Sequence, residues 1–135
     1  MYLSQLLLES FSLPAEAQQA VLTLRASTNL PERIVLGVTA VALAPLVEEM
    51  VFRGVLYPSL KQAGYPRLAL WLTALIFAAT HANLLTFLPL TLFAIVLTML
   101  YERTGSLLAP MVTHGCFNLA NYAWILWEGA RTAAS

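Results

Sequence analysis

Polar side chains of catalytic type stand inside otherwise apolar stretches of this sequence. They are Glu48, Glu49, Arg53, His81, His114 and Asn118. A charged group near the centre of a bilayer costs about 2.5–3.5 kcal/mol on insertion scales, so such groups are paired, neutralised or functional. Carboxylates beside imidazoles can take protons from water and return them, which is the chemistry of hydrolysis.

Spacing gives one glutamate a partner and leaves the other without one. Glu49 and Arg53 are four residues apart with the glutamate first, the favourable order for an ion pair along one helix face. Glu48 points about 100° away from Glu49, so another segment must supply its partner. The chain has two histidines, His81 and His114, and both lie in apolar stretches. These histidines are the candidate partners of Glu48.

His114 and Asn118 are also four residues apart, so their side chains project from one helix face and can address one point. We expect them to meet Glu48 and His81 in one buried polar site formed by three separate segments. The alternative is structural. In that case the glutamate and arginine pair clamps helices together, and each histidine makes a helix-bridging hydrogen bond.

The composition places the chain among membrane proteins. Hydrophobic residues make up 59% of it and charged residues 10%, with a formal net charge of zero. No basic run suggests a nucleic-acid partner. Cys116 is the single cysteine and cannot form an internal disulfide. We expect Cys116, Phe52 and Phe77 to be packing residues of the core.

Four apolar segments approach or exceed the length needed to cross ~30 Å of hydrocarbon. They cover residues 34–60, 68–85, 86–101 and 107–127, with turn signals at 64–66 and 102–105. Short turns imply antiparallel neighbours, so the expected fold is all-α, a polytopic transmembrane helix bundle of about four spans. Its core covers residues 33–130. Residues 1–32 are expected to form a surface segment with an amphipathic helix over 14–26.

Basic residues do not orient this bundle in the membrane. The first and third turns carry as many of them as the opposite side does: Lys61, Arg67 and Arg103 against Arg25, Arg33 and Arg131. Trp124 and Trp127, near the end of the last segment, are typical of an interfacial aromatic belt.

Three motifs in this order resemble those of one known family. They are EExxxR from Glu48 to Arg53, FxxxH from Phe77 to His81, and HxxxN from His114 to Asn118. The pattern is similar to the CPBP family, which contains CAAX proteases and bacteriocin-processing enzymes and is also called Abi. The flanking FRGVL and RTGSL agree as well, and the resemblance covers roughly residues 40–122.

The resemblance implies a membrane-embedded endopeptidase and a role for each residue. Glu48 and His81 would activate a water for attack on a peptide carbonyl, while His114 and Asn118 would stabilise the oxyanion. The paired glutamate and arginine would hold Glu48 in place. Members commonly carry several further helices before the double glutamate, whereas 33 residues precede the first span here. We therefore expect either a minimal member or part of a longer protein.

A zinc-dependent version of the same hydrolysis uses the same residues. Glu48, His81 and His114 would form a two-histidine, one-carboxylate site with an open position for water. The sequence contains no HExxH motif, so the favoured interpretation requires no cofactor.

The expected function is hydrolysis of a peptide bond in or near the bilayer of a prokaryotic cell membrane. The substrate would be a CAAX-type C-terminal tail, a leader peptide or another membrane-associated peptide or protein. The lipid bilayer is the second expected partner, a homo-oligomer is an open option, and no nucleic acid is expected. The alternatives are a non-catalytic membrane adaptor, a bacteriocin-immunity protein or, less favoured, a proton or metal-ion transporter.

Overall fold

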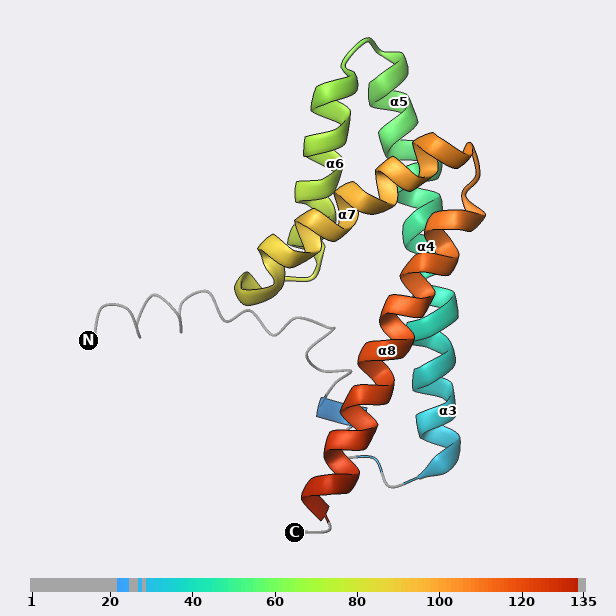
Figure 1. Ribbon diagram of the computed structural model, residues 1–135, viewed down its shortest axis with the longest axis vertical. Coiled ribbons are helices and arrows are strands. Elements are labelled where there is room, and N and C mark those ends of the chain that lie inside the picture. Colours follow the sequence, from blue (N-terminus) through green and yellow to red (C-terminus); the bar gives the residue numbers. More distant parts are fainter. Residues whose placement is uncertain (1–21, 25–26, 28, 134–135) are drawn as a thin grey trace, which may run out of the picture.

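The computed structural model describes residues 22–24, 27 and 29–133, and its regular structure there is entirely helical (Figure 1). A long first helix runs from Leu30 to Gln62. It consists of α3 (Leu30–Val38), η1 (Thr39–Leu43), α4 (Ala44–Glu49), η2 (Met50–Leu56) and α5 (Tyr57–Gln62). The remaining helices are α6 (Pro66–Thr80), α7 (Leu84–Thr104) and α8 (Leu108–Ala133).

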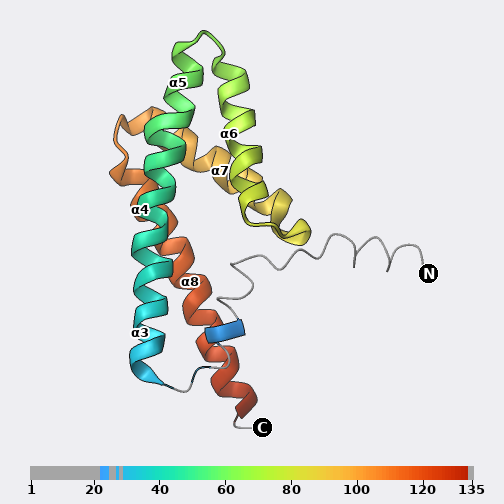
Figure 2. The same ribbon diagram turned by 180° about the vertical axis from the view of Figure 1, so that it is seen from behind.

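The other helices pack along the long helix Leu30–Gln62, which we call the spine. α5 and α6 form a hairpin, α7 crosses the bundle obliquely, and α8 runs beside α3 and α4 (Figures 1 and 2). α7 packs on both α6 and α8. α6, α7 and α8 therefore pack along one side of the stretch of the spine that carries the double glutamate.

Two prolines explain why the spine contains π-helical segments. Pro45 follows η1 and Pro58 follows η2, each within the first two residues of the next α-helical segment. Proline has no N–H, and its ring crowds the carbonyl four residues back, so a wider turn relieves the clash. The residue before each proline accordingly bonds five residues back: Ala44 N–H to the Thr39 carbonyl, and Tyr57 N–H to the Phe52 carbonyl.

The second helix ends earlier than the sequence pattern predicts. A span over 68–85 would place His81 inside a helix, but α6 stops at Thr80 and His81 is its C-cap. Ala82 then adopts a positive φ of 46°, and the Asn83 side chain accepts hydrogen bonds from the first N–H groups of α7. An N-cap of this kind starts a new helix. The third helix consequently begins at Leu84 and not at residue 86.

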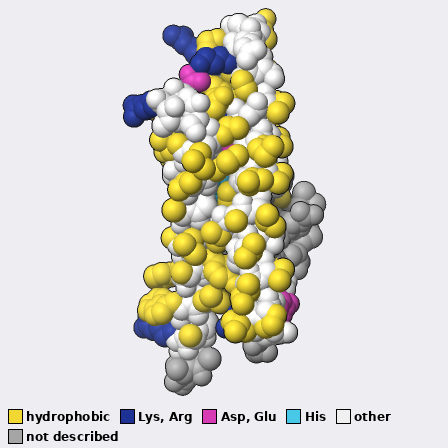
Figure 3. Space-filling view, turned by 90° about the vertical axis from the view of Figure 1, so that its right-hand side faces the viewer, with side chains coloured by type: hydrophobic (Ala, Val, Ile, Leu, Met, Phe, Trp, Pro, Cys, Tyr) yellow, Lys and Arg dark blue, Asp and Glu magenta, His cyan; other side chains and the backbone are white. Residues whose placement is uncertain are grey.

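Two of the helices have the length and apolarity of a membrane span. Leu30–Gln62 and Leu84–Thr104 are long and apolar enough to cross a bilayer, whereas the apolar Pro66–Thr80 is shorter. The prediction of four spans is thus confirmed in its all-helical class and in the order of its helices, but spanning length and apolarity are established for two. Figure 3 shows hydrophobic side chains over the middle of one face and basic side chains toward its two ends.

Both ends of the bundle carry features suited to a membrane interface. At one end, the Lys61 ammonium pairs with the Glu102 carboxylate. At the other, Trp124 and Trp127 are exposed and in contact, and the Arg131 guanidinium lies over the Trp127 ring. The amphipathic helix predicted over 14–26 falls outside the described residues except at 22–24, which are helical.

The hydrophobic core lies between η2, α6 and α7. Phe52, Phe77, Ala74 and Ala94 are buried there, which confirms the packing role expected of both phenylalanines. Small side chains allow membrane helices to approach closely, so the two alanines bring the backbones of α6 and α7 near each other. The expectation for Cys116 is wrong, because it is exposed and lines a shallow groove between the spine and α8.

α8 touches the backbone of the spine directly. A Cβ atom on Gly115 would lie 2.8 Å from the Val41 carbonyl oxygen, so only glycine fits there without a shift of backbone. Farther along, the Tyr122 ring lies over Gly37, and its hydroxyl donates to the Arg33 carbonyl.

We expect Gly115→Ala to destabilise the fold by about 1–3 kcal/mol, because the neighbouring atom is a backbone carbonyl that cannot rotate away. Gly129→Ala, on the same helix, is the matched control. No atom lies within 4 Å of its added Cβ, so it should be neutral or stabilising by up to about 1 kcal/mol. Thermal unfolding in detergent measures both, and equal effects of the two variants would contradict the close contact.

Candidate active site

The Arg53 guanidinium and the Glu49 carboxylate are the two most deeply buried charges of the described residues, and Arg53 makes the most contacts. It is 1% exposed and makes three hydrogen bonds. Nη1 donates to Glu49 Oε1 at 2.9 Å, Nη2 to the Ala94 carbonyl at 2.7 Å, and Nε to Thr98 Oγ1 at 3.3 Å. The Phe77 ring centroid lies 5.1 Å from its central carbon. The ion pair predicted from the i,i+4 spacing is therefore present, and α7 completes it.

Glu49 links this arginine to a histidine. Its side chain has no exposure, and Oε1 lies 2.9 Å from both Arg53 Nη1 and His114 Nδ1. A carboxylate can only accept, so the Nδ1 nitrogen of His114 carries the proton. This contact fixes the tautomer of the imidazole when it is neutral and stabilises the imidazolium when it is charged.

His114 stands between the two glutamates. Its Nε2 lies 3.8 Å from Glu48 Oε2, on the ring edge opposite Glu49. Arg53, Glu49, His114 and Glu48 thus form one chain of contacts, which we call the cluster. The Glu48 side chain is 32% exposed, so its carboxylate is the outer end of the cluster. One oxygen of each glutamate, Oε2 in both, is buried without a hydrogen-bond partner among the described residues.

Aromatic rings hold the His114 imidazole in place. The Phe77 centroid lies 5.7 Å from it and the Phe93 centroid 5.5 Å, both edge to face. Phe93 in turn stacks on Phe117 at 4.4 Å. α6 and α7 therefore each contribute an aromatic contact that sets the angle at which His114 faces Glu48.

His81 lies on the edge of this cluster. Its ring is 5.0 Å from the Phe77 ring, which also contacts His114. Its Nδ1 lies 2.9 Å from the Phe77 carbonyl, which can only accept, so Nδ1 carries the proton and Nε2 keeps a lone pair in the neutral ring. No hydrogen bond or ion pair joins His81 to Glu48 in the described part of the chain, although the two groups interact electrostatically.

Asn118 is engaged elsewhere on the spine. Its Nδ2 donates to the Ala40 carbonyl of η1 at 2.8 Å. It shares the face of α8 that carries His114, as the spacing predicts, but it donates to the backbone and not to a glutamate. An amide nitrogen carries two N–H groups, so one donor remains.

The donor set does not have the arrangement of a metal centre. Over residues 22–24, 27 and 29–133, no three side chains of histidine, cysteine, aspartate or glutamate are grouped so that they could hold a metal ion. Glu48 and His114 are neighbours, but His81 does not join them as a third ligand.

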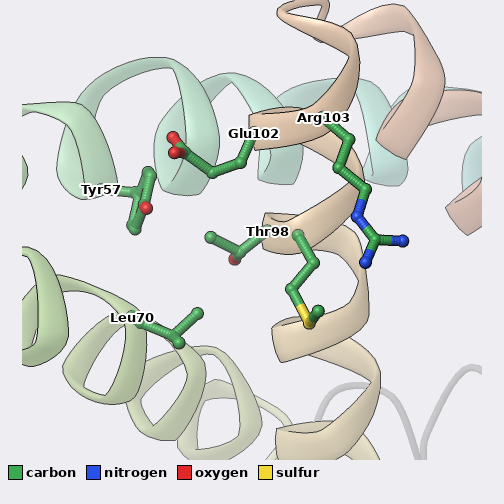
Figure 4. Close-up of a pocket in the computed structure, with 6 residues that line it drawn as sticks. Tyr57, Leu70, Thr98, Glu102 and Arg103 are labelled. Carbon is green, nitrogen blue, oxygen red and sulfur yellow. The ribbon is translucent and has the colours of Figure 1, made fainter.

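Two shallow pockets lie beside the cluster and not within it. One, shown in Figure 4, is lined by residues of α5, α6 and α7, namely Tyr57, Leu70, Thr98, Met99, Glu102 and Arg103. Thr98 is its link to the site, because the same hydroxyl accepts from Arg53. The other is an apolar groove between the spine and α8 that includes Val41 and Gly115. Glu48, His81 and His114 line neither.

Comparison with known families accounts for this arrangement. Residues 30–120 match the family described as type II CAAX prenyl endopeptidase, Rce1-like. The chain is a member of the Rce1-like family. The match includes every residue of the cluster, and it confirms the family resemblance of the three motifs. The family is one of membrane-embedded proteases of the CAAX type, and the two helices long and apolar enough to span a bilayer fit that description.

Two relatives of the Rce1-like chain come from bacteria. It is 38% identical over 93 residues to the uncharacterised protein YpbD of Bacillus subtilis, covering 66% of this chain and 45% of that one. It is 34% identical over 116 residues to an uncharacterised 24.3 kDa protein of Escherichia coli, covering 81% and 52%. The chain thus spans about half the length of these relatives. No solved structure gives a significant match.

Several contributors to the Rce1-like site were not predicted from the sequence. Thr98 and the Ala94 carbonyl satisfy Arg53, and Phe93 packs on His114. The available signal was the pair of threonines, Thr91 and Thr98, on one face of an otherwise apolar segment, since both are buried.

We expect Glu49→Gln to destabilise the protein by about 3–5 kcal/mol, because it leaves the buried Arg53 charge without its counter-ion. Glu48→Gln is the matched neighbour. That carboxylate is partly exposed and has one ionic contact at 3.8 Å, so its loss should cost about 1 kcal/mol or less. Denaturant unfolding in detergent measures the difference, and two equal values would refute this division between the glutamates.

Proposed function

We propose that this protein is an intramembrane endopeptidase that hydrolyses a peptide bond in or near the bilayer, with Glu48 as the base that activates water. The observation that carries the proposal is the position of His114 between two glutamates, 2.9 Å from one and 3.8 Å from the other. A packing cluster needs only Glu49 and Arg53 to neutralise each other. A second carboxylate facing a histidine adds a proton acceptor that packing does not require.

Charge balance supports this assignment. With His114 protonated, the cluster holds two cations, Arg53 and His114, and two anions, Glu48 and Glu49, and its net charge is zero. When Glu48 takes a proton from water and the hydroxide adds to a peptide carbonyl, the negative charge moves to the oxyanion. The total stays at zero, so the low-dielectric site never holds an uncompensated charge.

The reaction then follows from the donors and acceptors in place. Glu48 accepts the proton of a water whose oxygen attacks the carbonyl carbon. The protonated His114 stabilises the resulting oxyanion through Nε2–H, because Nδ1–H is committed to Glu49. Collapse of the intermediate breaks the C–N bond, and the proton on Glu48 passes to the leaving amine.

His81 and Asn118 complete the proposal. The lone pair on His81 Nε2 accepts a hydrogen bond from the attacking water and orients it toward the carbonyl. Asn118 supplies its second N–H to the oxyanion while the first holds the Ala40 carbonyl. One such donor is worth about 10²–10³ in rate.

The proposed substrate is a flexible tail or leader of a membrane-associated protein in a prokaryotic cell membrane. The family description names prenylated CAAX tails, and both relatives reported above are bacterial. Bacteria are not expected to make prenylated CAAX tails, so a bacterial peptide or membrane protein is the proposed natural substrate. A CAAX peptide remains the natural probe.

A membrane adaptor or immunity protein is the second candidate. The observation that favours it is that several polar side chains already make hydrogen bonds to backbone carbonyls. Arg53 bonds to α7, Asn118 to the Ala40 carbonyl, and His81 to a carbonyl of its own helix. Under this reading Glu48 has no chemical role, and its replacement leaves function intact.

We expect Glu48→Gln to lower cleavage by about 10²–10⁴-fold, the usual contribution of a general base, without loss of folding. The assay uses wild-type and variant protein in vesicles with an internally quenched prenylated CAAX peptide, and compares cell-membrane proteomes for fragments that depend on Glu48. Glu102→Gln, an exposed carboxylate outside the cluster, is the control and should cleave normally. Cleavage that survives Glu48→Gln would eliminate Glu48 as the base.

We further propose that hydrolysis proceeds without a metal, since the cluster balances its charge through Arg53. Prolonged chelation of the purified protein should therefore leave cleavage of the same peptide unchanged. The zinc alternative makes the opposite prediction, namely loss of activity on chelation and recovery on addition of Zn²⁺ but not of Mg²⁺. Metal content measured before and after chelation serves as the control.

A further inference from the structure

We infer that Pro45 is a positioning residue that sets His114 and Asn118 against Glu48 by changing the backbone of the spine. The inference rests on the proposed function for its kinetic part. Pro45 lies three residues before Glu48 and makes none of the hydrogen bonds of the cluster. It acts through two carbonyl groups that it leaves pointing at α8.

The first carbonyl is that of Ala40. In an α-helix it would accept from the N–H of residue 44, but Ala44 bonds to Thr39 in the π-helical turn. The π-helical donor for Ala40 would be residue 45, which is proline and has no N–H. The Ala40 carbonyl therefore lacks a main-chain donor from either register, and Asn118 Nδ2 donates to it at 2.8 Å. An unpaired carbonyl in an apolar span is costly, so this bond is strongly favoured.

The second carbonyl is that of Val41, four residues before the proline. This is the carbonyl against which a proline ring clashes, and the wider turn moves it aside. It faces Gly115, where a Cβ atom would lie only 2.8 Å from its oxygen. Two features therefore determine how closely α8 approaches the spine at this point. Pro45 sets the position of the Val41 carbonyl, and Gly115 has no side chain to collide with it.

Both contact points lie within about one helical turn of His114, on its C-terminal side. Gly115 follows His114 directly, and Asn118 lies one turn farther along the same helix. With α8 held at two places on the spine, the depth and rotation of His114 relative to Glu48 and Glu49 are fixed. The bond from Asn118 to the Ala40 carbonyl also sets which way its amide faces, and hence where its remaining N–H points.

The test is Pro45→Ala in the full chain. Alanine restores an N–H at position 45 and is a far better helix former, and this gain opposes the packing lost with the fully buried Pro45 ring, so thermal stability should change little. The restored N–H competes with Asn118 for the Ala40 carbonyl. We expect kcat on the quenched prenylated CAAX peptide to fall about 10- to 100-fold, the scale of a displacement near 1 Å, with little change in KM.

Pro89→Ala is the control for the backbone effect, because Pro89 is also inside a helix but is exposed and lies outside the cluster. It should raise stability, since no packing is lost, and leave kcat unchanged. A merely structural role for Pro45 would leave turnover intact, as in Pro89→Ala. That outcome would overturn the inference.

A double-mutant cycle tests the link without any enzymatic readout. In the wild-type background, Asn118→Ala leaves the Ala40 carbonyl unpaired and should lower the unfolding midpoint by several degrees. In the Pro45→Ala background the new N–H can pair with it, so the same change should cost less than half as much. Additive effects overturn the inference. Coupling in a protein that cleaves no peptide would instead support the Pro45–Asn118 link and count against the proposed function.

Discussion

A guanidinium removed from water must be neutralised on every side, and the architecture of this protein follows from how Arg53 is neutralised. Its charge is balanced by Glu49 on the same helix, and its remaining donors reach the Ala94 carbonyl and Thr98 on α7. Glu49 shares its oxygen with His114 on α8. A single buried cation thus joins the spine to two other helices, and removal of either leaves a polar group unpaired.

The site is therefore a property of the whole bundle and not of one motif. The spine supplies the carboxylates, α6 supplies the Phe77 ring and His81 at its end, α7 completes the arginine, and α8 supplies His114 and Asn118. The π-helical turn before Pro45 adds a second kind of link, because the carbonyls of Ala40 and Val41 face α8 there. Polar side chains on α8 then bind backbone and carboxylate alike, which gives an apolar helix pair a unique register.

The sequence predicted the parts of this arrangement that depend on spacing along one helix. Glu49 with Arg53, and the shared face of His114 and Asn118, both follow from a rotation of about 100° per residue. Which helix meets which could not be derived this way. His114 was expected to serve Glu48, yet its shorter contact is to Glu49.

The hydrophobic pattern of the sequence also does not predict where the helices are locally interrupted. The π-helical turns depend on backbone hydrogen bonds that a hydrophobic pattern does not record, although Pro45 and Pro58 mark where they occur. The end of α6 depends on the capping of α7 by Asn83, a short-range polar contact that competes with the apolar run through it. Exposure of Cys116 likewise depends on which face of α8 meets the spine.

The early end of α6 has a consequence for hydration. Its 15 residues rise about 22 Å, and Glu48 lies about 21 Å along the spine from Gln62, so the turn at His81 to Asn83 lies at nearly the same depth as the Glu48 carboxylate. Non-helical backbone at such depth needs water or protein around it, and the exposed Leu84 and Leu85 show that the described residues do not enclose it. A continuous helix would pair its own backbone groups at this level. The break leaves backbone groups that water can bind, and water is the reagent that the proposed hydrolysis consumes.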